Sequence, residues 1–218
     1  MFNRTMRVTG TGKLSVKPDT IHLNLTLTGV HEDYSQAVRH SDQAVKDLKE
    51  ALEKEAFDPG DLKTASFSVD SKYEGYQEPS GQYRQRFIGF EYDLRLFLEM
   101  EADKERLGLL LTAILKSGVP VHFSLAYTLK DPQAAQKELL ARAVRDAQDK
   151  AACLAQAAGV KLGLLVRMDD SIEETTFRRE IMRSAGPVGQ AAYAAMDADL
   201  EPADLQLSER VRMVYEIA

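Results

Sequence analysis

Alternating apolar and polar residues give the first indication of structure along this chain. Apolar residues occupy every second position from Ile21 to Leu27, as expected for a strand with one face on a core and the other in solvent. Other segments alternate in the same way or are apolar throughout. Residues 74–82 lie between two of them and are rich in turn-forming residues, which predicts a hairpin. The predicted strands cover residues 21–28, 62–73, 88–100, 121–129, 160–168 and 205–217.

Apolar residues at steps of three and four predict helices over residues 33–56, 103–118 and 131–158. Each range begins at an aspartate, a good N-cap. The second range ends at Gly118 and the third is followed by Gly159, and each glycine can take a left-handed C-terminal conformation. The third helix carries an alanine-rich stripe that lets it lie close against a sheet. That predicted stripe is Leu140, Ala143, Val144, Ala147, Ala151, Leu154 and Ala158.

The order of these elements predicts an α+β fold, because helices with one apolar side must cover one face of antiparallel sheets. We expect a first βαββ unit over residues 1–101, a linking helix over 102–118 and a second βαββ unit over 119–218. The two units show no residue-level repeat, and together they are expected to make one domain. The connection over residues 169–204 is long for a compact domain, which favours a functional or flexible role.

Charge and composition narrow the range of partners. The 218 residues include 28 Lys and Arg against 34 Asp and Glu, a formal net charge of −6, which disfavours binding to nucleic acid. No run is apolar enough to span a membrane, and the N-terminus lacks the apolar segment of a secretory signal. We therefore expect a cytoplasmic protein. A periplasmic or secreted location is the alternative if a leader has been removed.

No local motif predicts catalytic, cofactor-binding or metal-binding residues. In the segment VTGTGKLSVKPD, Gly12-Lys13 is followed by Leu14, so the segment does not match a phosphate-binding loop, and we interpret Gly10 and Gly12 as a bend in a strand. The four histidines, at positions 22, 31, 40 and 122, lack metal-ligand spacing. The single cysteine, Cys153, is expected to be a half-buried structural thiol.

Two regions are candidate interaction surfaces. Tyrosines cluster around the predicted hairpin and could contact a partner or simply pack at its tip. Basic and small residues in the 169–204 connection form the other candidate, for which a mobile loop is the alternative. The candidate residues are Tyr73, Tyr76 and Tyr83 in the hairpin and Arg178, Arg179, Arg183 and Tyr193 in the connection.

The segment VTGTGKLSVKPDTIHLNLTL resembles the start of the SIMPL-domain family, the YggE-like or periplasmic immunogenic proteins. The segments IGFEYDLRLFLE, ARAVRDAQDKAACLAQAAGVKLG and ERVRMVYEI follow in the order that this family shows. The resemblance implies an α+β fold, a tendency to self-assemble and roles in envelope or stress physiology and signalling, and it implies no catalytic residues. The matching positions at the start are Val8, Gly10, Gly12, Val16, Pro18 and Asp19.

We therefore expect a non-enzymatic protein that assembles into a homo-oligomer and binds a partner. One alternative is an enzyme or small-ligand binder with a site in the groove between the two βαββ units. Another is an adaptor that does not self-assemble. No cofactor is expected in the leading interpretation.

Overall fold

The computed structural model describes residues 4–79, 81–170, 179–183 and 202–218. Its helices are α1 (Tyr34–Lys54), α2 (Lys104–Lys116) and α3 (Pro132–Ala158), with a short 3-10 helix η1 (Pro59–Asp61). Its strands are β1 (Thr5–Val16), β2 (Thr20–His31), β3 (Lys63–Gln77), β4 (Tyr83–Glu101), β5 (His122–Thr128), β6 (Leu162–Asp170), β7 (Arg179–Arg183) and β8 (Leu205–Ile217). The predicted α+β class is confirmed.

The helices begin and end close to the predicted positions because their caps work as expected. The side chains of Asp103 and Asp131 accept hydrogen bonds from backbone N–H groups three residues later, which satisfies donors that the helix leaves unpaired. Helix α3 ends at Gly159, whose φ of 68° is left-handed. Asp33 precedes α1 without such a side-chain bond.

The described chain divides into two compact units, each with its own sheet. One unit comprises Met1–Asp19, Thr128–Arg179 and Pro202–Ala218, and the other comprises Thr20–Tyr127 and Glu180–Glu201. The first holds a three-stranded sheet of order β1-β8-β6, and the second a five-stranded sheet of order β3-β4-β2-β5-β7. This arrangement differs from the expected linear division, because β1 joins strands from the end of the chain and β5 joins the sheet of the first half.

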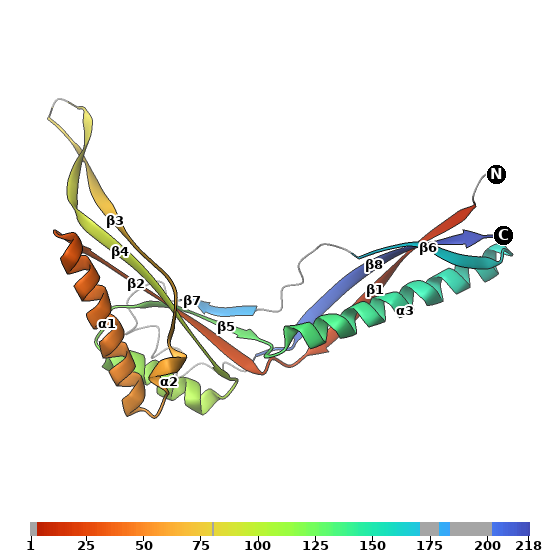
Figure 1. Ribbon diagram of the computed structural model, residues 1–218, viewed down its shortest axis with the longest axis horizontal. Coiled ribbons are helices and arrows are strands. Elements are labelled where there is room, and N and C mark those ends of the chain that lie inside the picture. The colour runs from red at the N-terminus through yellow and green to blue at the C-terminus, as the bar shows by residue number, and fades with distance from the viewer. Residues whose placement is uncertain (1–3, 80, 171–178, 184–201) are drawn as a thin grey trace. The chain divides into compact units, whose positions relative to one another are not determined.

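The core of the larger unit lies between its sheet and two helices. Helices α1 and α2 cover one face of this sheet (Figure 1). The odd-numbered residues of β2 from Ile21 to Leu27 are at most 1% exposed, so the alternation in the sequence identified the buried face correctly. The even-numbered residues point to the opposite face, where His22, Asn24 and Thr26 are half-buried.

Helix α3 packs against β1 and β8 in the smaller unit, and two glycines of β1 make this close approach possible. A Cβ atom added at Gly10 would lie 2.5 Å from the backbone nitrogen of Ala147, and one at Gly12 would lie 2.9 Å from the carbonyl carbon of Leu139. Strand β1 pairs with β8 without interruption across both positions. The glycines therefore serve close packing, and the expected bend is absent.

The packed side of α3 also differs in detail from the predicted stripe. Ala143, Ala147 and Ala151 are buried as expected, but Leu139 and Ala155 complete the row and Leu154 is 50% exposed. The buried residues thus follow a strict step of four, which keeps the smallest side chains against the sheet. Cys153 is exposed, so the expectation of a half-buried thiol is wrong.

Candidate functional site

Strands β3 and β4 form a long antiparallel hairpin, which extends past the start of α1 as a two-stranded ribbon (Figure 1). Two-stranded ribbons are marginally stable in water unless one face packs against something else. The side chains on the two faces of this ribbon therefore indicate what it contacts.

One face of the hairpin carries four aromatic rings, which we call the aromatic face: Phe90, Phe87, Tyr73 and Tyr83. Exposure increases along this face, from 45% at Phe87 through 54% at Tyr73 to 81% at Tyr83. Ring centroids lie 5.3 Å apart between Phe87 and Phe90 and 5.7 Å apart between Tyr73 and Phe87, with edge-to-face geometry. Phe90 packs against the core of the larger unit. The aromatic face is therefore an extension of that core beyond the cover of α1.

The opposite face of the hairpin is charged, and its charges are paired within the chain. Ion pairs join Lys72 to Glu91 at 2.7 Å, Arg86 to Glu74 at 2.9 Å and Arg84 to Glu78 at 3.0 Å. The strand register places Tyr76 on this side, opposite Arg84. The three candidate tyrosines are thus divided, with Tyr73 and Tyr83 on the aromatic face and Tyr76 on the charged face.

The candidate residues of the long connection are described only in part. Arg178 and Tyr193 lie outside the described residues. Arg179 and Arg183 are the two ends of β7, of which the backbone alone is described.

A second apolar surface lies on β6, an edge strand of the three-stranded sheet. Leu164 is 77% exposed, and Val166 and Met168 are each more than half exposed. Exposed apolar edge strands are open to pairing with another chain.

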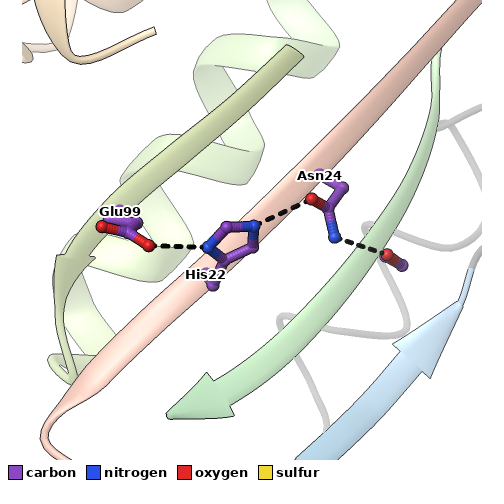
Figure 2. Close-up of polar contacts among 4 residues, drawn as sticks. His22, Asn24 and Glu99 are labelled. Atoms are coloured by element: carbon purple, nitrogen blue, oxygen red, sulfur yellow. Dashed lines mark hydrogen bonds and ion pairs between the residues drawn. The ribbon is translucent and has the colours of Figure 1, made fainter. Parts of the chain in front are cut away.

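Polar side chains form a chain of contacts on the face of the five-stranded sheet opposite α1 and α2 (Figure 2). Nδ1 of His22 is 2.8 Å from Oε1 of Glu99, and Nε2 is 2.9 Å from Oδ1 of Asn24. Nδ2 of Asn24 donates to Oγ of Ser124 at 3.1 Å. The four residues come from β2, β4 and β5, so strand pairing sets their relative positions.

This chain of contacts does not have the geometry of a catalytic triad. A serine nucleophile needs a direct hydrogen bond to its base, and here Asn24 lies between Ser124 and His22. No group of three or more His, Cys, Asp or Glu side chains suited to a metal ion occurs in the part of the chain that the structure describes. The arrangement instead fixes the orientation of the Asn24 amide and the Ser124 hydroxyl.

The rings of His31 and His40 stack beside a hollow of about 400 Å³ that Tyr92 also lines. Their centroids are 4.1 Å apart, and His31 also stacks on Tyr92 at 6.1 Å. Burial lowers the pKa of His31, and the neighbouring His40 lowers it further. Burial raises the pKa of the Tyr92 hydroxyl. His31 is half-buried in this stack.

Comparison with known families gives a match along nearly the whole chain. Residues 6–215 match the model of the family described as "SIMPL: Protein of unknown function (DUF541)". The chain belongs to the SIMPL family. This match confirms the resemblance found in the sequence. The family description states no function for its members.

Two relatives of this SIMPL protein carry the same name, "26 kDa periplasmic immunogenic protein", and come from Brucella melitensis biotype 1 and Brucella abortus strain S19. Each is 26% identical over 163 residues, which cover 75% of this chain. The match spans 65% of the length of each relative.

These names bear on the location expected from the sequence. They call the relatives periplasmic, and they give no support to the cytoplasmic location expected from the sequence. Among the described residues, no helix combines the length and apolar character needed to cross a membrane.

Proposed function

We propose that this SIMPL protein is a non-enzymatic assembly protein of the cell envelope, which associates with further copies of itself through the aromatic face of the hairpin. The observation that carries the proposal is the set of exposed rings Phe87, Tyr73 and Tyr83, which continue the apolar surface outward from Phe90 at the edge of the core. Surfaces of this kind mark sites of protein association. The periplasmic name of the Brucella relatives supports the envelope location.

A second copy is the partner that the chemistry of the hairpin favours. The aromatic face has no charged side chain among its four rings, so it suits an equally apolar surface, and its own copy supplies one. The charges on the other face are already paired within the chain, so they give little attraction to a charged partner. The exposed apolar residues of β6 supply a further surface that can join copies at a sheet edge.

The experiment is sedimentation velocity of the purified protein over micromolar concentrations. We expect the unaltered protein to sediment as an oligomer. A double variant, Tyr73→Ser with Phe87→Ser, removes two rings of the aromatic face and should weaken association at least 100-fold, about 2.7 kcal/mol. The matched control is Tyr76→Ser, which removes a tyrosine of similar exposure, 42%, from the charged face and should leave association unchanged.

Two results would contradict this proposal. If the unaltered protein sediments as a monomer at every concentration, the proposal of self-assembly is refuted. If the double variant associates as strongly as the unaltered protein, the aromatic face is not the interface between copies. The alternative of an enzyme or ligand site between the two βαββ units stays a prediction.

A further inference from the structure

The face of the five-stranded sheet opposite α1 and α2 contains a hollow of about 520 Å³. We call it the polar trough and define it by the polar residues that line it: Asn24, Thr26, Arg95, His122 and Ser124. These residues come from three neighbouring strands, β2, β4 and β5. The volume lies in the range of small-molecule sites in proteins.

Two side chains of the polar trough are held in place before any ligand arrives. Asn24 is fixed between His22 and Ser124, and His22 is fixed in turn by Glu99 (Figure 2). Fixed donors and acceptors lose little freedom when a ligand binds, so preorganisation favours binding here.

Two other polar groups of the trough have no hydrogen-bond partner among the described residues. The side chains of Thr26, which is half-buried, and His122, which is exposed, make no hydrogen bond within the described ranges. A hydroxyl and a neutral imidazole can each donate one hydrogen bond and accept another. The trough therefore offers both donors and acceptors to a ligand.

The charges around the trough favour a neutral ligand over an anion. Arg95 is the one lining residue with a permanent charge, and its Nε donates to the carboxylate of Asp93 at 3.1 Å. A second carboxylate, Glu99, lies on the same strand and contacts His22. A phosphate or carboxylate entering the trough would meet a cation that is already paired and two nearby negative charges.

An aromatic ring lies on the same face of the sheet, next to the trough and outside its lining. Phe97 lies directly opposite Asn24 in the strand register and is half-buried on the same face. Its ring stacks with that of His22, with centroids 5.5 Å apart. A ligand with hydroxyl groups at its edges and C–H groups on its faces matches this combination.

We propose that the polar trough binds a neutral oligosaccharide. Sugar hydroxyls exchange hydrogen bonds with Thr26, His122 and Ser124, and the C–H face of one sugar ring packs beside Phe97. Exposed sheet faces bind oligosaccharides in other β-structures, such as OB-folds. The trough lies on a different part of the sheet from the aromatic face, so sugar binding does not depend on assembly through the hairpin.

The test is saturation-transfer difference NMR on the full chain, which observes the ligand and tolerates an oligomer of any size. The probes are maltotetraose and chitotetraose at millimolar concentration. Thr26→Val and His122→Ala each remove a group without a described partner, so both variants should fold, as checked by circular dichroism. Each should weaken binding about fivefold or more, the effect of one lost hydrogen bond. The matched control is Thr28→Val, two residues along the same face of β2 and outside the trough, which should bind as the unaltered protein does.

The proposal is overturned if neither tetrasaccharide gives a saturation-transfer signal at 10 mM, taken as an order-of-magnitude limit for weak sites. It is also overturned if Thr28→Val weakens binding as much as Thr26→Val, or if inorganic phosphate displaces the sugar. A monomeric protein that still binds the probes would refute self-assembly and leave this inference intact.

Discussion

The close packing of α3 on β1 gives a direct test of the fold through the substitution Gly10→Ala. The new Cβ atom would lie 2.5 Å from the nitrogen and 2.7 Å from the Cβ atom of Ala147, and closer still to the carbonyl oxygen of Ala143. Relief of these overlaps requires a shift of about 1 Å, because attractive contacts between heavy atoms begin near 3.5 Å. Most of the obstructing atoms belong to the helix backbone, which no side-chain rotation can move away.

The magnitude follows from two opposing effects. Overpacking of a well-packed core costs about 1–3 kcal/mol, and the upper end applies because the whole of α3 must move against a cluster that includes Val8, Val211 and Met213. The alanine also restricts the unfolded chain, which offsets at most about 1 kcal/mol. We therefore expect Gly10→Ala to lower the free energy of unfolding by about 2 kcal/mol.

Urea unfolding followed by circular dichroism measures this change. Gly75→Ala is the matched control, because a Cβ atom at that strand glycine meets no atom within 4 Å, and we expect its effect to stay within about 0.5 kcal/mol. Equal unfolding midpoints for the two variants would refute the close contact between α3 and β1.

Three further predictions concern stability. Gly108 lies inside α2, where an added Cβ atom meets nothing within 4 Å. Because alanine favours a helix interior over glycine, Gly108→Ala should raise the free energy of unfolding by up to about 1 kcal/mol. An unchanged urea midpoint would contradict this prediction. The pKa of His31 is lowered from its ordinary value of 6.5 by burial and by His40, so the unfolded chain binds more protons just below that pH and stability should fall as the pH drops from 7 toward 5. In His31→Gln the free energy of unfolding should no longer show this fall between pH 7 and pH 5. Identical pH profiles of the free energy of unfolding for this variant and the unaltered protein would contradict the prediction. The pKa of Asp146 is lowered by its hydrogen bonds from Lys150 and the Thr11 backbone, so its stabilisation is present above its ordinary value of 3.8 and is lost as the pH falls further. Asp146→Asn should thus destabilise the protein at pH 7 and match it in strong acid, and an equal loss at both pH values would exclude the ionic contribution.

The elements were predictable because their signals are local. Alternation identified the buried face of β2, and Asp131 and Gly159 fixed the ends of α3. That β1 is a strand, and which strand it pairs with, was harder to predict from the sequence. The glycines of β1 weaken the local strand pattern, and its partner β8 begins only at Leu205. Pairing between such distant segments leaves little trace in either one.

The candidate surfaces were predictable only in part, for a related reason. The tyrosine-rich hairpin was visible in the sequence, but an irregularity between Lys72 and Tyr73 helps to decide which rings share a face. The polar trough was missed because Asn24 and Ser124 lie 100 residues apart and neither belongs to a motif. Half-buried polar residues at alternate positions of β2 were the one available signal.

The pairing of β1 with β8 has a consequence for biosynthesis. Thr5–Val16 is synthesised before residues 20–127, but its ladder hydrogen bonds can form only after its partner Leu205–Ile217 has been synthesised. Residues 20–127 can meanwhile collapse around their own core, since domains generally fold as units during synthesis. Completion of the smaller unit thus requires that translation has passed Ile217, and a product truncated before Leu205 would keep β1 without its partner strand, as an aggregation-prone edge.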